Sequence, residues 1–84
     1  MTHIKLTNPT GRSTEARVLE YNGDEYFFSY QTCVAFRGIA SDKQYRKIKR
    51  KNKWGRTTSK HFKEMGCADF QEIEDADTFA ALLP

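Results

Sequence analysis

The residues best suited to chemistry in this sequence are positive charges concentrated in one segment. Residues 43–63 carry ten Lys and Arg and no Asp or Glu. Lys is a compact point charge, so a row of lysines on one surface suits the phosphates of a polyanion such as nucleic acid. The segment, called the basic block below, therefore predicts a binding surface for phosphates. Two aromatic residues in it, Tyr45 and Trp54, can stack on unpaired bases.

Spacing within the basic block predicts a strand rather than a helix. Ile48 and Trp54 occupy even positions, while lysines occupy positions 47, 49, 51 and 53. This period of two places the lysines on one face of a strand, and apolar residues at helical spacing are missing. The predicted contact residues are Tyr45, Arg46, Lys47, Lys49, Arg50, Lys51, Lys53, Trp54, Arg56 and Lys60.

Two other interpretations of the basic block stay open from sequence. The charge can bind an acidic protein, or it can belong to a solvated edge strand, where lysines discourage aggregation between sheets. Residues 64–84 contain six acidic residues and no Lys or Arg, so this tail can also fold back and neutralise the block. Nucleic acid is favoured because ten like charges repel one another more than solubility alone requires.

Three hydroxyl residues, 57–59, lie at the start of a short helical pattern over residues 59–65. Ser and Thr are preferred at helix N-caps, and Gly66 suits the position just after the last helical residue. Ordinary capping needs only one hydroxyl. With Arg56 and Lys60 beside them, the three hydroxyls can instead complete an anion site at the helix N-terminus.

Cysteine and histidine do not show the spacing of a metal or catalytic site. A structural zinc site needs four ligands, and the chain has only two Cys and two His, at scattered positions. Cys33 or Cys67 with His61 as a base, or the acidic residues within 69–77, form no pattern typical of an enzyme. We therefore expect reduced thiols, no metal, no cofactor and no catalytic residues.

Length and composition predict a single folded domain over residues 1–84. Six Phe, four Tyr and one Trp supply apolar mass, and charged residues make up 30% of the chain, with a net charge of +3. The N-terminus lacks the apolar stretch of a signal peptide, and no run approaches the ~18 apolar residues of a membrane span. These features predict a cytoplasmic protein that does not interact with membranes.

The clearest local structural signal is Asn22-Gly23, which lies between two β-prone runs. Both residues tolerate positive φ, as a two-residue type I′ hairpin turn requires. That turn pairs Tyr21 with Asp24, Leu19 with Tyr26 and Arg17 with Phe28. We expect the more aromatic face of the hairpin to point to the core, that is Leu19, Tyr21, Tyr26, Phe28 and Tyr30, and the other face to carry Val18, Glu20, Glu25 and Phe27.

The remaining elements are short. Strands are predicted at residues 3–7, 32–37, 44–54 and 69–73, and Asp75 or Asp77 can cap a last helical turn over residues 78–83. The predicted fold class is α+β, with a small antiparallel sheet of about four strands and one or two short helices.

Two segments resemble a known family. SYQTCVAFR, residues 29–37, has the form S-Y-x-T-x-V-A-[YF], and WGRTTSKHF, residues 54–62, places a polar T-T-S-K-H run after an aromatic and a small residue. In these motifs the chain is similar to DUF8033, a family of small proteins encoded by tailed bacteriophages. The resemblance covers roughly residues 26–63 and implies a phage origin without an activity. The KIKRKNK run is more basic than the family's usual middle strand.

Together these observations predict a non-enzymatic protein that acts by binding. The first hypothesis is nucleic-acid binding through backbone phosphates. The alternative, which the phage resemblance favours, is an inhibitor of a host protein or defence complex in the cytoplasm of an infected bacterium, acting by direct protein binding, where the host partner can be a nucleoprotein.

Overall fold

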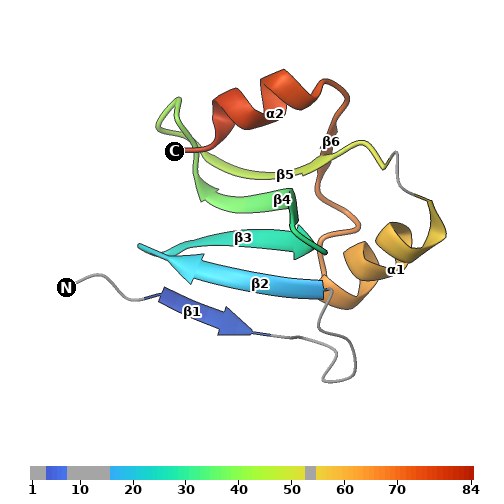
Figure 1. Ribbon diagram of the computed structural model, residues 1–84. Helices are drawn as coiled ribbons and strands as arrows, with labels where there is room; N and C mark the ends of the chain where they lie inside the picture. The colour runs from blue at the N-terminus through green and yellow to red at the C-terminus, as the bar shows by residue number, and fades with distance from the viewer. Residues whose placement is uncertain (1–3, 8–15, 53–54) are drawn as a thin grey trace.

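The computed structural model describes residues 4–7, 16–52 and 55–84. They form one sheet whose six strands follow chain order and two helices (Figure 1). Neighbouring strands are antiparallel except for the last pair, which is parallel. The predicted α+β class is confirmed, with more strands than expected. The elements are β1 (Ile4–Thr7), β2 (Ala16–Tyr21), β3 (Asp24–Ser29), β4 (Thr32–Ile39), β5 (Tyr45–Arg50), α1 (Arg56–Met65), β6 (Gln71–Ile73) and α2 (Ala76–Leu82).

The predicted hairpin is confirmed in its turn and in its register. Asn22 and Gly23 have φ of 52° and 82°, and they connect β2 to β3. The pairs Tyr21–Asp24, Leu19–Tyr26 and Arg17–Phe28 lie opposite each other as expected. A turn that only a few residue types can adopt thus sets the register of the strands beside it.

The core beneath α1 is built on the hairpin face opposite to the one predicted to point to the core. Val18 and Phe27 are only 6% and 1% exposed, and α1 packs against β2 and β3. The face prediction was therefore wrong, since Tyr21 and Tyr30 are exposed. This core cluster consists of Ala16, Val18, Phe27, Val34, Ala35, Phe62, Met65, Cys67 and Phe70.

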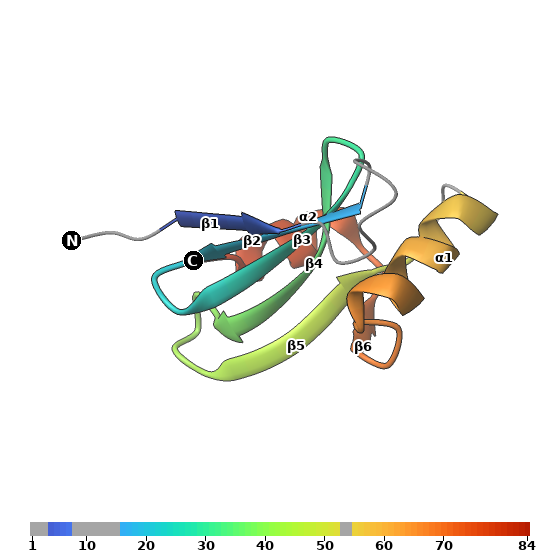
Figure 2. The same ribbon diagram turned by 90° about the horizontal axis from the view of Figure 1, so that it is seen from below.

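A second, smaller core lies on the opposite face of the sheet, where α2 packs against β5 and β6. Phe79 of α2 meets Phe36 and Ile48, and Tyr26 packs against the edge of this cluster. Both faces of the sheet are therefore partly covered, each by one helix over different strands. Figure 2 shows that the sheet is twisted and curved rather than flat.

One end of α1 lies where it was predicted, and the other does not. Gly66 ends the helix in the left-handed conformation, as expected, and its N–H and that of Cys67 donate to Lys63 and Phe62 carbonyls. The start was predicted wrongly: the helix begins at Arg56, and no hydroxyl caps it. The Asn52 side chain holds this turn instead, accepting from Gly55 N at 3.1 Å and donating to Gly55 O at 2.8 Å.

The cap of α2 is Asp75, one of the two residues that the sequence indicated. The Asp75 carboxylate accepts from Thr78 N at 3.1 Å and from the Thr78 hydroxyl at 2.8 Å. Asp75→Ala should therefore lower the free energy of unfolding by about 1 kcal/mol, which chemical denaturation can measure. Asp77→Ala is the matched control, because Asp77 lies in the first turn without capping it. Equal losses in both variants would show that general charge, not the cap, matters.

Candidate functional site

The lysine strand of the basic block lies inside the sheet. β5 is hydrogen-bonded to β4 on one side and to β6 on the other. It is therefore not the solvated edge strand that one interpretation of the sequence required. Its period of two is confirmed: Ile48 is fully buried in the core under α2, while Lys49 lies on the other face, against Phe62 of α1.

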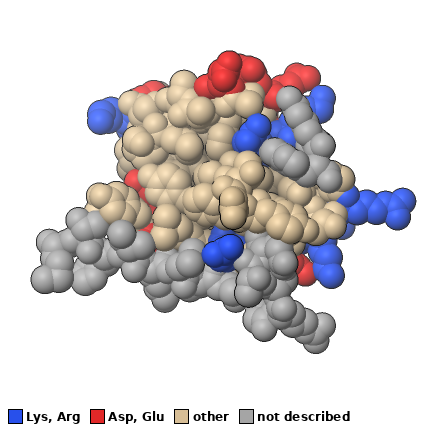
Figure 3. Space-filling view, viewed as in Figure 1, with Lys and Arg blue, Asp and Glu red and all other residues tan. Residues whose placement is uncertain are grey.

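Alternation along β5 divides the predicted contact residues between two faces. Tyr45, Lys47 and Lys49 lie on the face of α1, whereas Arg46 and Arg50 lie on the face of α2 with Ile48. Figure 3 views the face of α2, where uncharged atoms cover most of the surface and Lys and Arg stand apart from one another. The basic block is thus not one continuous positive surface.

Three of the predicted contact residues pair with acids. Arg46 pairs with Asp42 at 2.5 Å, Lys51 with Glu74 at 3.3 Å and Lys60 with Glu64 at 3.8 Å. Glu64 and Glu74 belong to the acidic segment after the block, and β6 of that segment lies directly beside β5. The suggestion that the acidic tail folds back on the basic block is therefore confirmed for Lys51, whereas Lys60 and Glu64 are four residues apart within α1.

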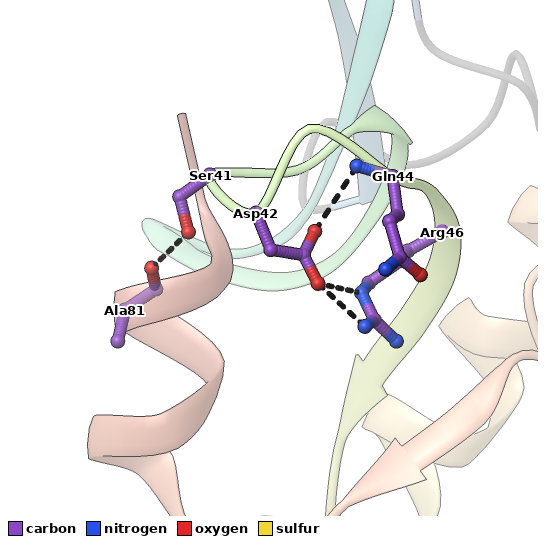
Figure 4. A network of polar contacts seen from close by, with 5 residues as sticks. All are labelled: Ser41, Asp42, Gln44, Arg46 and Ala81. Carbon is purple, nitrogen blue, oxygen red and sulfur yellow. Dashed lines mark hydrogen bonds and ion pairs between the residues drawn. The ribbon is translucent and has the colours of Figure 1, made fainter.

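Arg46 is committed to the turn between β4 and β5 (Figure 4). Its Nε and Nη2 donate to the Asp42 carboxylate at 2.9 and 2.5 Å, and the other carboxylate oxygen accepts from Gln44 N at 3.2 Å. The Arg46 guanidinium lowers the pKa of Asp42 below its ordinary value. In the same turn Ser41 Oγ donates to the Ala81 carbonyl at 2.5 Å, which ties α2 to this turn. Arg46 therefore has a structural role here.

A polar hollow of about 240 Å³ lies between the end of β5 and α1. Lys49 donates from Nζ to the Ala68 carbonyl, and this Nζ lies 5.4 Å from the ring centroid of Phe62. Asn52 donates to Ser59 Oγ at 2.6 Å. The lining residues are Lys49, Asn52, Ser59, Phe62, Lys63, Ala68 and Glu72. The hollow thus combines two ammonium groups, one hydroxyl and one carboxylate.

The hydroxyl cradle predicted at the start of α1 does not form. Thr58 is 2% exposed and its hydroxyl lies 3.3 Å from Ser29 Oγ, so it faces the interior. Ser29 Oγ also lies 2.7 Å from Nδ1 of the buried His61. The motif residues Ser29, Thr58 and His61 therefore form a buried polar contact that connects β3 to α1. Arg56 is exposed at the first position of the helix.

The sequence analysis did not select Asn52 or Lys63, which line the hollow. Ser59, which also lines it, was one of the three hydroxyls predicted at an anion site. Asn52 three residues before Gly55 was the available signal, since Asn side chains often hydrogen-bond a following turn. Lys53 and Trp54 lie outside the described residues.

The two thiols lie in apolar surroundings. Burial raises the pKa of Cys33 to about 11 and that of Cys67 to about 12, so both are protonated at neutral pH. Both cysteines are free. Within the described ranges, no three His, Cys, Asp or Glu side chains are grouped to hold a metal ion. No helix in the same ranges is long and apolar enough to cross a bilayer.

Comparison with known proteins places the chain in a family. DUF8033, described as a family of unknown function, matches residues 3–80. This chain belongs to DUF8033. The DUF8033 match extends well beyond the two motif segments and includes all the strands, α1 and most of α2. No curated protein and no solved structure matches the chain.

Proposed function

We propose that this DUF8033 protein is a non-enzymatic binding protein that takes up single-stranded nucleic acid through its backbone phosphates. The proposed surface is the α1 side of β5, from Tyr45 through Lys47 and Lys49 to Lys63. One observation carries the proposal: Lys47 and Lys49 continue along one strand face from an exposed aromatic ring into a hollow that holds a further lysine.

The regular spacing of side chains along a strand suits a polyanion whose phosphates are regularly spaced. Residues two apart on one face are separated by about 6.6–6.8 Å, so Tyr45, Lys47 and Lys49 present one ring and two ammonium groups at regular intervals. Tyr45 is 60% exposed, which leaves its ring available for stacking. Ser59 and Asn52 add polar groups beside Lys63 in the hollow, while Glu72 lowers its net positive charge. Arg56 is not among the residues of the hollow.

Salt dependence tests how many phosphates are neutralised. With three lysines engaged, log K for a single strand should fall against log salt with a slope of roughly −2. Lys47→Gln and Lys63→Gln should each reduce the magnitude of this slope by about 0.7, measured by fluorescence anisotropy with a labelled oligonucleotide. Arg17→Gln is the matched control, because it removes one charge from the opposite face. A slope that no lysine variant alters would contradict the proposed surface.

A protein partner is the second candidate, and an exposed apolar pair favours it. Ile39 and Tyr45 lie opposite each other on β4 and β5 and are 48% and 60% exposed. Next to them Lys47 lies opposite Arg37 on the same two strands, and Arg37 itself pairs with Glu25. Apolar groups beside cations suit an acidic protein surface. In this alternative the protein is a phage-encoded inhibitor of a host protein or defence complex in the bacterial cytoplasm.

A pull-down from bacterial lysate, with and without nuclease, separates the two candidates. Binding to nucleic acid predicts material that nuclease removes and that purified oligonucleotides replace. A protein inhibitor predicts one partner that survives nuclease treatment and is lost in Tyr45→Ala. Tyr21→Ala serves as the control, since Tyr21 is also an exposed tyrosine but lies in the turn region of the β2–β3 hairpin.

A further inference from the structure

A second hollow lies over β2 and β3, away from the basic surface. It measures about 310 Å³ and is lined by Arg17, Leu19, Phe28, Tyr30 and Gln31. Arg17 is opposite Phe28, and Leu19 is opposite Tyr26, which packs at the edge of the core under α2. These side chains therefore share the face of α2. Because α2 packs against β5 and β6, it does not cover the hollow over β2 and β3.

The lining combines an apolar body with one cation. Leu19, Phe28 and Tyr30 supply aliphatic and aromatic surface, and Arg17 supplies a guanidinium. Tyr30 is 52% exposed and adopts a φ of 57° in the turn after β3, where its ring lies 5.7 Å from that of His61. This contact places Tyr30 beside α1, so the aromatic wall of the hollow rests on a buried residue of the helix.

The guanidinium of Arg17 has an unused donor. Its Nε is buried and has no hydrogen-bond partner, and no other buried side-chain nitrogen or oxygen of the described residues is in this state. An unpaired buried donor is unfavourable, and arginine binds a carboxylate side-on through Nε and one terminal nitrogen at once. A carboxylate in the hollow would meet Arg17, and a small movement of this side chain would let the buried Nε join the contact and gain a partner.

We propose that this hollow binds a small carboxylic acid that carries an apolar or aromatic body. The size suits such a ligand, because 310 Å³ is at the lower end of the range of about 300–1,000 Å³ for small-molecule sites. A single guanidinium among the lining residues matches a monoanion rather than a phosphate dianion. The ring of the ligand packs against Phe28 and Tyr30 while its carboxylate meets Arg17. This site lies on the other face of the sheet from the proposed nucleic-acid surface.

Titration of the ¹⁵N-labelled protein with 3-phenylpropionate tests the site by NMR. The largest amide shifts should fall on β2 and β3 around Arg17 and Phe28. The neutral amide of the same acid lacks the carboxylate, and propionate lacks the ring. Each should therefore bind at least about tenfold more weakly. Phenyl phosphate should bind no more tightly than 3-phenylpropionate; tighter binding would overturn the assignment to a monocarboxylate.

Two variants of Arg17 and one control complete the experiment. Arg17→Gln should weaken 3-phenylpropionate binding by about tenfold to a hundredfold, and Arg17→Lys, which keeps the charge but not the fork, should also weaken it. Lys47→Gln, which removes a charge from the opposite face, should leave it unchanged. The Arg17 variants are first checked for an unaltered amide spectrum elsewhere. Absence of localised shifts in the wild type at millimolar acid, or equal binding by Arg17→Gln, would refute the site without affecting the nucleic-acid proposal.

Discussion

Gly38→Ala should lower the free energy of unfolding by about 2–4 kcal/mol, among the largest effects of any single methyl group in this fold. Gly38 has a φ of 152°, a region that side chains disfavour, and a Cβ built there would lie 2.1 Å from Oδ1 of Asp24. The Asp24 carboxylate accepts from Ile39 N at 3.0 Å, so it is held over Gly38. The substitution therefore adds backbone strain and displaces a hydrogen-bonded carboxylate at once. Chemical denaturation followed by circular dichroism measures the loss.

Two further variants separate the two causes. Gly23→Ala introduces a side chain at a φ of 82° with nothing within 4 Å, so it measures backbone strain alone and should cost about 1–2 kcal/mol. The Asp24→Ala background removes the contacts with Oδ1 and Cγ, and the contact with Cβ at 2.9 Å remains. Gly38→Ala should then cost less than it does beside Asp24, giving a favourable coupling between the two substitutions. If the two costs simply add, Asp24 does not restrict this position.

Local chemistry made some of these elements predictable. The Asn22-Gly23 turn and the end of α1 at Gly66 depend on residues within a few positions, and both are confirmed. Asp75 is the one of the two predicted candidates that caps α2. The alternation of β5 was also local, because Ile48 is the apolar residue between flanking lysines, and it is the one that is buried. Short-range signals of this kind need no knowledge of what packs above them.

The wrong predictions share a dependence on tertiary packing. Both faces of the β2–β3 hairpin carry apolar side chains, and only the positions of the two helices decide that Val18 and Phe27 lie in the main core. At the start of α1, Thr58 turns inward because Ser29 and His61 lie there, which leaves Asn52 to hold the turn. Composition cannot distinguish a hydroxyl that caps a helix from one that packs beneath it.

The candidate surface changed for the same reason. From sequence the basic block was one row of charge, but Lys51 pairs with Glu74 of the folded-back tail, and Arg46 and Lys60 pair with acids four residues away. Strand alternation then places Arg50 on the face of α2. Lys63 gains importance because α1 carries it to the hollow beside Lys49. Net charge of a segment is readable from sequence, whereas its distribution over surfaces depends on the register of β5 and β6.

Charge reversal on this surface is the strongest test of the proposed function. The double variant Lys47→Glu, Lys63→Glu should weaken binding to a single-stranded oligonucleotide by at least tenfold at physiological salt, because about two phosphate contacts are lost and two repulsions replace them. All sequences should be affected alike, since phosphate contacts carry no base information. Lys49 is left intact because its hydrogen bond to the Ala68 carbonyl and its contact with Phe62 give it a packing role.

The matched control is Lys43→Glu, Lys60→Glu, which alters net charge by the same amount. Lys43 lies in the turn before β5, and Lys60 is already paired with Glu64, so neither belongs to the row formed by Lys47, Lys49 and Lys63. A much smaller loss of affinity in this control would locate binding on the α1 side of β5. Equal losses in the two double variants would mean that overall charge governs the interaction. If neither variant loses affinity, while a nuclease-resistant partner from lysate is lost only in Lys47→Glu, Lys63→Glu, the same surface binds an acidic protein.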